Sequence, residues 1–263
     1  MAQIELGLLK ARLGDLAGHF DVDALDECDS TSSELMRRAE AGAPAGTVIV
    51  ADRQSAGRGR RGRTWLSEPA ASLTFSLLWR FSGPFSRLSG LSLAVGLALA
   101  QALEKLGARG ICLKWPNDVL LQSGEDYAKL AGILIELSSD RRGTQAVIGI
   151  GLNLAPPAVD LPQAAAGLSQ ACIVPPERHA VLAAILLELV AVFEVFAVDG
   201  FNGLKNDWQQ RHAWQDQRVQ ILDENALPLL GRCLGADAEG ALLLDTAHGI
   251  ERIFSGDVSL RRA

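Results

Sequence analysis

The chain contains few of the residues that form disulfides or bind metals. Its 263 residues include four cysteines and four histidines. No two cysteines form a C-x-x-C motif, and the histidines do not lie at a spacing typical of metal ligands. We therefore expect the cysteines to be reduced and mostly buried, as in a cytoplasmic protein, without a disulfide framework.

The sequence also lacks clear signals for a membrane. No basic segment followed by an apolar core opens the chain, so we expect no signal peptide. One long apolar run covers residues 180–198, but it contains Glu188 and Glu194. Each acidic residue near a bilayer centre costs about 2.5–3.5 kcal/mol. We predict a buried helix rather than a membrane span.

An overall excess of positive charge is missing as well. The formal net charge is −6, which argues against general binding of polyanions. Against this acidic background, five arginines and one carboxylate lie between Asp52 and Arg63. A local basic segment on an acidic protein favours a small anionic ligand over a nucleic-acid track.

The composition predicts a folded chain with a sizeable core, since 48% of the residues are hydrophobic and 21% are charged. Residues 1–27 predict a short helix and a lead-in. Thr31-x-x-Glu34 matches a capping box, followed by a helix that begins at Leu35 and ends near Gly42. Further helices are expected at 87–107, 177–198 and 202–213. Strands are expected at 46–52, 72–80, 111–115, 129–137 and 145–154, with a surface hairpin loop at 119–128.

After Trp214 the pattern changes to short strands every eight to twelve residues. Turn signals separate them at Glu224-Asn225, Gly235-Ala236 and His248-Gly249. This spacing is typical of a small all-β barrel of about 45 residues. We therefore divide the chain into a domain at 1–214 and a domain at 215–263.

The basic segment reads SAGRGRRGR at residues 55–63, and it contains the pattern G-x-G-x-x-G of dinucleotide sites. A dinucleotide fingerprint opens a helix, whereas Pro69 and a predicted strand follow here. A nucleic-acid site is the second interpretation, but Trp65 is the only nearby aromatic side chain for stacking. A solvated loop is the third. The interleaved glycines favour a mobile lid in which backbone N–H groups and arginines bind a phosphate.

Three further positions carry chemistry. In LKWPNDVLL, residues 113–121, a strand delivers Lys114 and a turn presents Asn117 and Asp118. Lysine and hard oxygen donors suit a magnesium nucleotide, although a simple turn explains the same residues. Lys129 starts one predicted strand, which also contains Gly132. Asn153 lies at the end of another predicted strand. The alternative for Lys129 is a solvated side chain without a ligand. The alternative for Asn153 is a cap that ends its strand.

Together and in this order, these motifs resemble the biotin protein ligases from about residue 26 to the C-terminus. The matching segments are DSTSSEL, SAGRGRRGRTW, LKWPNDV, KLAGILIEL, GIGLNL and the terminal SLR. The resemblance implies an α+β fold, with a central mixed β-sheet flanked by helices as in lipoate ligases and a C-terminal SH3-like β-barrel. It also implies a reaction in which ATP activates biotin to biotinyl-5′-AMP. A lysine of a biotin carboxyl carrier protein then accepts the biotin.

The resemblance assigns roles to individual residues. The implied biotin-binding residues are Ser30, Thr31, Ser32, Gln54, Gly57, Arg58, Gly59, Arg60, Lys129 and Gly132. The implied ATP-binding residues are Arg60, Trp65, Lys114, Asn117, Asp118, Lys129, Asn153 and Arg261. The implied catalytic residues are Lys129, Arg58 and Arg60, and the implied Mg²⁺ ligands are Asn117 and Asp118. Ser32 stands where the family more often has asparagine, and no aromatic residue follows Pro157 to cover adenine.

We expect biotin, ATP, Mg²⁺ and the biotin carboxyl carrier protein of acetyl-CoA carboxylase as partners, in the cytoplasm and without a membrane. Too few residues precede the first motif for the N-terminal winged helix of some relatives, so we expect a monofunctional ligase that binds no nucleic acid. An exposed sheet edge is compatible with a homodimer. The alternatives are a lipoate-type ligase of the same fold and a non-enzymatic nucleic-acid-binding protein.

Overall fold

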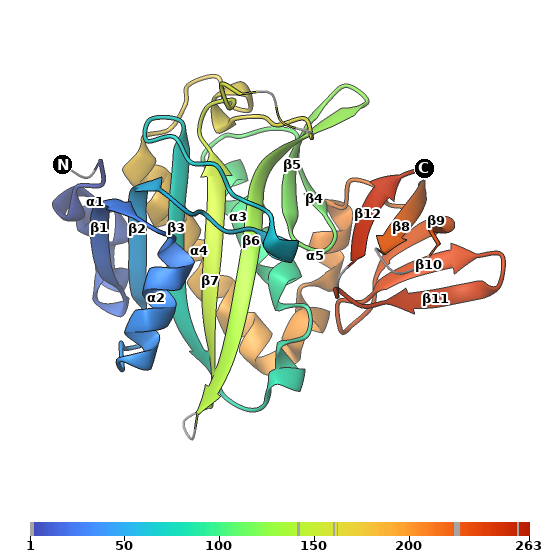
Figure 1. The fold of residues 1–263 in the computed structure, drawn as a ribbon, viewed down its shortest axis with the longest axis horizontal. Helices are drawn as coiled ribbons and strands as arrows, with labels where there is room; N and C mark the ends of the chain where they lie inside the picture. Colours follow the sequence, from blue (N-terminus) through green and yellow to red (C-terminus); the bar gives the residue numbers. More distant parts are fainter. Residues whose placement is uncertain (1–2, 141–142, 160, 162, 224–226, 257) are drawn as a thin grey trace.

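The chain folds into two sheets of very different size. A computed structural model describes residues 3–140, 143–159, 161, 163–223, 227–256 and 258–263. A seven-stranded mixed sheet, covered by helices, forms the body, and a five-stranded antiparallel sheet follows near the C-terminus (Figure 1). This architecture confirms the α+β fold with a central mixed sheet and a small C-terminal β-domain.

The large sheet has the strand order β1-β2-β3-β7-β6-β5-β4. β1 and β2 pair in parallel, and the other neighbours pair antiparallel. The strands are β1 (Asp21–Cys28), β2 (Thr47–Gln54), β3 (Ser72–Phe81), β4 (Ile111–Lys114), β5 (Asp118–Ser123), β6 (Asp126–Asp140) and β7 (Gly143–Asn153). All five strands expected in this part of the chain are present.

Two strands of the sheet were not expected. β1 lies at an edge, is mostly half-buried, and alternates carboxylates with apolar residues, so its sequence resembled a polar lead-in. β5 pairs with β6 where a surface hairpin loop was predicted at 119–128, so the hairpin was expected but its paired strands were not. The hairpin turns at Gly124, whose φ of 63° suits glycine. Val119, Leu120 and Leu121 are buried, which explains why these residues form a strand.

The helices cover both faces of the sheet. α3 (Leu91–Lys105) and α4 (Arg178–Asp199) lie behind it, whereas α2 (Thr31–Glu40) lies in front (Figure 1). The segments Phe85–Lys105 and Arg178–Gly203 are long and apolar enough to cross a membrane by length and composition. In the fold α4 packs against α3, α1 and β3, as predicted for a buried helix. Remaining helical segments are α1 (Leu6–Leu13), α5 (Lys205–Gln210), η1 (Gly14–His19), η2 (Arg60–Gly62), η3 (Phe85–Leu88), η4 (Leu168–Gln170) and η5 (Gly200–Gly203).

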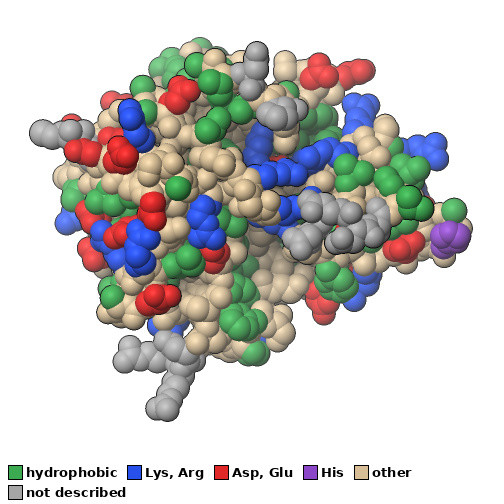
Figure 2. All heavy atoms as spheres, viewed as in Figure 1, with side chains coloured by type: hydrophobic (Ala, Val, Ile, Leu, Met, Phe, Trp, Pro, Cys, Tyr) green, Lys and Arg blue, Asp and Glu red, His purple; other side chains and the backbone are tan. Residues whose placement is uncertain are grey.

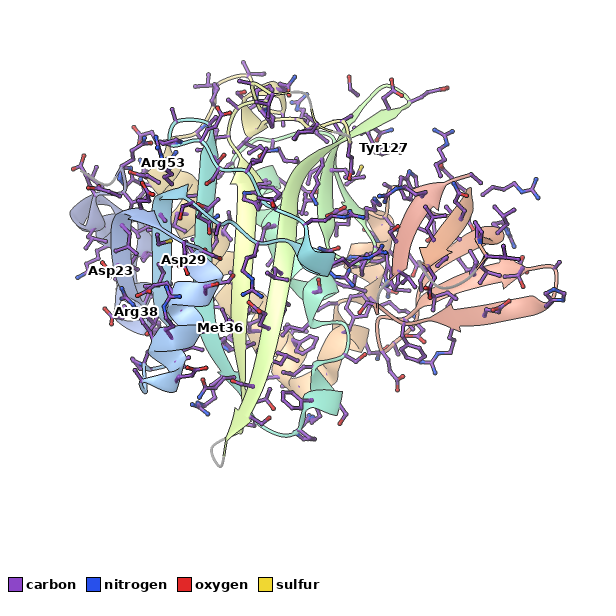
Figure 3. All side chains as sticks on the ribbon, in the orientation of Figure 1. Asp23, Asp29, Met36, Arg38, Arg53 and Tyr127 are labelled. Atoms are coloured by element: carbon purple, nitrogen blue, oxygen red, sulfur yellow. The ribbon has the colours of Figure 1, made fainter. Side chains whose placement is uncertain are left out.

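Helix α2 begins earlier than predicted and without the expected capping box. Its N-cap is Ser30, which forms no side-chain cap, and Thr31 is already helical. The carboxylate of Glu34 binds Arg37 at 2.8 Å and Arg38 at 2.7 Å. Ion pairs from these arginines to Asp29 and Asp23 fasten α2 beside β1 (Figure 3 labels Asp23, Asp29 and Arg38). The start of α2 therefore leaves its hydroxyl groups for other contacts.

The C-terminal sheet has the order β11-β10-β9-β8-β12. Its strands are β8 (Arg218–Asp223), β9 (Leu229–Ala236), β10 (Leu242–Thr246), β11 (Gly249–Ile253) and β12 (Val258–Arg262). The turn expected at Glu224-Asn225 lies outside the described residues. Trp115 Nε1 donates a hydrogen bond to Gly240 O at 3.1 Å and joins this sheet to the body. A domain boundary at residue 214 stays a prediction.

Candidate active site

A cavity lies on the α2 side of the large sheet, beneath the segment that joins β2 to β3. In Figure 1 this segment crosses in front of β7 and β6. The cavity is lined by Ser30, Thr31, Ser32, Gln54, Arg58, Gly59, Arg60, Trp65, Thr74, Asn117, Lys129, Gly132, Ile133, Leu134, Gly149, Ile150 and Gly151. Most of the predicted site residues therefore meet in one place. The predicted residues outside its lining are Gly57, Lys114, Asp118, Asn153 and Arg261.

One end of the cavity, which we call the hydroxyl end, is lined by Thr31, Ser32 and Gln54, and Ser76 supports these residues from outside the lining. The backbone N–H of Thr31 donates to Gln54 Oε1 at 2.8 Å. Ser76 Oγ donates to Thr31 Oγ1 at 2.8 Å and lies 3.1 Å from Ser32 Oγ. Both serines and Thr31 are buried. This end holds neutral donors and acceptors in fixed positions, which suits a polar, uncharged ligand group.

Ser76 was not predicted, although the sequence carried a signal for it. Thr74 and Ser76 are polar residues two apart in β3, a strand whose buried positions are otherwise mostly apolar. Residues two apart face the same side of a strand, so both point toward the cavity side. Their alternation marks the face of β3 that lies under α2.

The floor of the cavity is made of glycines from β6 and β7. A Cβ at Gly149 would lie 2.4 Å from Ser32 Oγ, and a Cβ at Gly151 would lie 2.2 Å from the Trp65 ring. A Cβ at Gly132 would lie 3.2 Å from the Lys129 side chain and 3.3 Å from the same indole. Glycines two apart in GIG were the missed signal, since they clear one face of β7. Any larger residue at Gly149 would collide with Ser32 of α2, and any larger residue at Gly151 would collide with Trp65.

The opposite end of the cavity, which we call the charged end, contains Lys129 and its counter-ion. Lys129 Nζ lies 2.6 Å from Asp118 Oδ1, and Lys114 Nζ lies 3.6 Å from Asp118 Oδ2. Lys114 is buried, and its ammonium also lies 5.1 Å from the centre of the Trp214 ring. Asp118 therefore connects the lysine at the cavity to a buried lysine behind it.

Burial and charge act in opposite directions on this group. Burial lowers the pKa of Lys114 to about 8, although Asp118 acts to raise it. Burial alone would raise the pKa of Asp118, but the ammoniums of Lys129 and Lys114 bring it below its usual range. Asp118 is thus ionised at neutral pH and compensates the lysines around it.

The segment at residues 55–65, which we call the lid, closes the cavity. It folds back on itself through hydrogen bonds from Gly59 N to Arg63 O at 2.7 Å and from Trp65 N to Gly57 O at 2.9 Å. Gly57 does not line the cavity, but a Cβ there would lie 2.3 Å from Trp65 O. This close approach of the two backbones requires glycine at position 57, and a ligand contact of Gly57 stays a prediction.

Arg58 and Arg60, the two lid arginines predicted to bind ligand, each form hydrogen bonds with residues outside the lid. Arg58 forms a two-fold hydrogen-bonded ion pair with Glu136 of β6, at 2.8 and 3.1 Å. Arg60 donates to Asn117 Oδ1 at 3.2 Å and to the carbonyls of Ser255 and Gly256 at 3.0 and 2.9 Å. The lid thus spans the sheet and reaches the C-terminal domain.

Trp65 follows the arginines and enters the cavity. Its ring lies over Gly132 and Gly151, with Lys129 Nζ 5.8 Å from the ring centre. Trp65 Nε1 is buried and has no hydrogen-bond partner among the described residues. The indole therefore offers an aromatic face and an N–H donor inside the cavity.

Two predicted nucleotide residues support the site from outside it. Asn153 Nδ2 donates to Ala166 O at 3.1 Å, which holds the segment after β7 against Lys129. Lys129 also exchanges backbone hydrogen bonds with Ala164 and Ala166. Arg261 lies in β12, and burial together with Arg63 lowers its pKa, against the effect of Asp118. These residues lie beside the charged end without lining the cavity.

The described part of the chain contains no group of three or more His, Cys, Asp or Glu side chains placed to hold a metal ion. Asn117 donates its amide to Ile133 O at 2.8 Å and accepts from Arg60, while Asp118 accepts from lysines. Lysine and arginine side chains gather on this face where the body meets the C-terminal sheet (Figure 2). The arrangement suits an anionic ligand better than a resident cation.

Two family models match the chain. The Biotin/lipoate A/B protein ligase family matches residues 27–153, and the Biotin protein ligase C terminal domain matches residues 216–261. The first match contains all the strands and the lid that build the cavity. The second contains the five-stranded sheet.

Proteins named as ligases align with nearly the whole chain. Bifunctional ligase/repressor BirA of Escherichia coli (strain K12) is 36% identical over 99% of this chain and 80% of its own length. Biotin--[acetyl-CoA-carboxylase] ligase of Mycobacterium tuberculosis is 31% identical over 97% of this chain and 94% of its own. The structure of biotin protein ligase from Aquifex aeolicus in complex with biotin and ATP has a TM-score of 0.77 at 32% identity, covering 92% of this chain and 99% of that one. The chain therefore belongs to the biotin/lipoate A/B protein ligase family and carries the biotin protein ligase C terminal domain.

Proposed function

We propose that the chain is a biotin protein ligase. It joins biotin to ATP, which forms biotinyl-5′-AMP and releases pyrophosphate, and it then transfers biotin to a lysine of a biotin carboxyl carrier protein. Relatives with ligase names and the similar Aquifex aeolicus structure, a complex with biotin and ATP, support this reaction. The single observation that carries the proposal is one cavity with a neutral hydroxyl end and a charged end.

The two ends match the two parts of biotin. The ureido ring is polar but uncharged, so it fits Thr31, Ser32 and Gln54, whose hydrogen bonds hold them in place. The carboxylate is an anion, so it lies toward Lys129 and the lid arginines. The glycine floor leaves room for the apolar ring and chain between these ends.

In the first step an oxygen of the biotin carboxylate attacks the α-phosphorus of ATP. The new P–O bond forms as the bond to pyrophosphate breaks, and pyrophosphate leaves with its electron pair. Two anions must approach each other, and Lys129 and Arg60 offset their repulsion and the charge that develops at phosphorus. Lys129 reaches the reacting oxygens by exchanging its contact with Asp118.

In the second step the neutral amine of the acceptor lysine attacks the acyl carbon. An amide bond forms, AMP leaves from the carbonyl, and the amine loses its proton to solvent. Until the carrier arrives, the closed lid keeps water from the mixed anhydride. Trp65 covers the site from above and supplies a ring face for the nucleotide.

We propose that Mg²⁺ arrives with the triphosphate of ATP rather than as a resident ion. Magnesium is commonly held by one or two side-chain oxygens together with substrate phosphates. Asn117 and Asp118 stay the predicted ligands, and they would have to exchange contacts with Arg60 and Lys129 to reach the ion. Lys114, Asn153 and Arg261 act on the nucleotide side by holding this charged end in place.

The carrier protein, a cytoplasmic location and a homodimer belong to the same proposal. The carrier of acetyl-CoA carboxylase is the acceptor suggested by the name of the Mycobacterium tuberculosis relative. β1 is the edge of the large sheet available for pairing with a second copy. Size-exclusion chromatography with light scattering, with and without biotin and ATP, tests the dimer.

Exchange of labelled pyrophosphate into ATP tests the reaction directly. The expected result is exchange that depends on biotin. A folded protein that shows no biotin-dependent exchange would refute the proposal. Lipoic acid in the same assay tests the lipoate-type alternative, which predicts exchange with lipoic acid and none with biotin.

Nucleic-acid binding through the lid is the remaining alternative. It predicts affinity for oligonucleotides that falls by several decades as salt rises, if six or more phosphates are contacted. The contacts of Arg58 with Glu136 and of Arg60 with carbonyl oxygens argue against an open basic track.

A further inference from the structure

Glu136 lies in β6 and does not line the cavity. Its two carboxylate oxygens accept hydrogen bonds from both terminal nitrogens of Arg58, at 2.8 and 3.1 Å. The two residues are 78 positions apart in the chain, and the cavity lies between the strand and the lid. The pair is thus a direct polar contact between the lid and the sheet beneath it.

The position of this contact matters for how the lid is held. A hydrogen bond from Trp65 N to Gly57 O closes the base of the lid, where both ends of the segment meet. Beyond that base, Arg60 joins the lid to Asn117 and to the C-terminal domain, and Arg58 joins it to β6. The η2 turn contains no buried residue, so it has no hydrophobic anchor of its own. Polar contacts must therefore set the position of the lid tip.

Arg58 uses a large part of its hydrogen-bonding capacity on this pair. Two terminal N–H groups bind Glu136, and a third contact reaches Ser33 Oγ at 3.4 Å. A guanidinium has five N–H donors, and a two-fold pair with a carboxylate fixes its plane as well as its position. Glu136 therefore orients the arginine that was predicted to contact the ligand.

We propose that Glu136 is a positioning residue, which holds the lid closed over the cavity through Arg58. It touches neither ligand and acts only through the arginine. The consequence for catalysis rests on the proposed function, since a lid that opens more often releases or hydrolyses the acyl-adenylate faster. The effect on the lid itself does not depend on which ligand the cavity binds.

The expected size of the effect follows from exposure. The side chains of Arg58 and Glu136 are 41% and 23% exposed, so solvent weakens the pair. A partly exposed two-fold pair shifts an open–closed equilibrium by roughly two- to fivefold. Glu136 is thus a modest latch, and its loss should leave the global fold intact.

Limited trypsin digestion of the full chain, followed by mass spectrometry, measures lid opening directly. The lid offers trypsin four sites, at Arg58, Arg60, Arg61 and Arg63. Glu136→Gln should raise the rate of cleavage in the lid by about two- to fivefold without ligand. Glu104→Gln is the matched control, because Glu104 forms a two-fold pair with Arg211 far from the lid and with similar exposure.

A double-mutant cycle separates the latch from a general loss of stability. Arg58→Gln and Glu136→Gln should each speed cleavage at Arg60, Arg61 and Arg63, and the double variant should cleave no faster than either one. Glu136→Asp should restore part of the protection. Additive effects of the two substitutions, or a lid cleaved at the same rate in Glu136→Gln and in wild type, would overturn the proposal.

Retention of biotinyl-5′-AMP links the latch to the reaction. Glu136→Gln should release the preformed adenylate about two- to fivefold faster in a chase with unlabelled ligand, while the rate of pyrophosphate exchange at saturating biotin and ATP stays near that of wild type. A slower exchange at saturation with unchanged release would contradict a positioning role. If wild type makes no adenylate, the proposed function fails, but the trypsin result still decides whether Glu136 holds the lid.

Discussion

The two ends of the cavity solve different problems with different residues. The hydroxyl end is neutral, and its groups already bond to one another through Ser76 and Gln54. At the charged end, by contrast, Lys129 binds Asp118, so a counter-ion occupies the group that a ligand needs. Recognition of the ring system is therefore preformed, whereas activation of the carboxylate requires an exchange of ion pairs.

This difference has an energetic basis. A satisfied network of neutral hydrogen bonds in a buried site stays in place without ligand and costs little to keep. A cluster of like charges repels itself when no ligand is bound. The fold therefore places Asp118 beside the lysines, and a polyanionic ligand would take over this role. Substitutions at the charged end should therefore affect the reaction more than substitutions at the hydroxyl end.

The largest effect is expected for Lys129→Ala at the charged end. The substitution removes the ammonium that neutralises the carboxylate and the α-phosphate as they meet. We expect biotin-dependent pyrophosphate exchange to fall by about a thousandfold, the range found for a positioned donor to developing charge. Biotin binding, measured by calorimetry, should change far less. Exchange near the wild-type rate would remove Lys129 from the mechanism.

The second prediction concerns the stability cost of the charged end. Burial lowers the pKa of Lys114 from 10.5 to about 8, so the folded chain holds this proton less tightly than the unfolded chain does. Unfolding takes up a proton between these values, and the contribution of Lys114 to stability therefore increases as the pH rises from about 8 toward 10.5.

Urea unfolding at pH 7.5 and at pH 10 measures this contribution. Wild type should gain up to about 3 kcal/mol relative to Lys114→Met between the two conditions. Lys105→Met serves as the control, because Lys105 is largely exposed and paired with Glu188. An identical pH dependence for wild type and Lys114→Met would contradict a buried, destabilised ammonium.

A smaller effect is expected for Arg60→Ala in the lid. The substitution removes hydrogen bonds to Asn117 and to the carbonyls of Ser255 and Gly256, so the lid loses its link to the C-terminal domain. We expect release of the acyl-adenylate to accelerate about tenfold, since about 1.4 kcal/mol is typical for such contacts. The rate of this release is measured from the dissociation of labelled biotinyl-5′-AMP from the protein. Unchanged release would show that Arg60 does not hold the lid.

The smallest effect is expected for Ser76→Ala at the hydroxyl end. Ser76 lies outside the cavity lining but bridges Thr31 and Ser32. Loss of this bridge should raise the KM for biotin by about fivefold, with little change in kcat, because it affects binding before and during the reaction alike. A fall in kcat with unchanged KM would instead assign the hydroxyl end to the chemical step.

The sequence predicted the parts of the site that are contiguous in the chain. The lid, the Lys114–Asp118 turn and the strand with Lys129 each carry their own signal, and the helix and strand patterns place them on one sheet. The resemblance to a ligase family then supplied their order. The α+β fold, its C-terminal β-domain and most cavity residues were predictable for this reason.

The residues that the sequence did not reveal depend on contacts between distant strands. Glu136 matters because the register of β6 places it opposite the lid, and Gly149 matters because it lies under Ser32. Neither relation leaves a local pattern in the chain. The unexpected strands β1 and β5 have the same origin, since an edge position and a buried hairpin overrode their polar or loop-like sequences.

A crystal structure with biotin and ATP, solved to show biotinyl-5′-AMP, tests the difference between the two ends most directly. We predict the ureido ring against Thr31 and Gln54 with their hydrogen bonds unchanged, and Lys129 moved from Asp118 to the acyl phosphate. An adenylate bound with Lys129 still on Asp118, or with its ring at the charged end, would contradict this account.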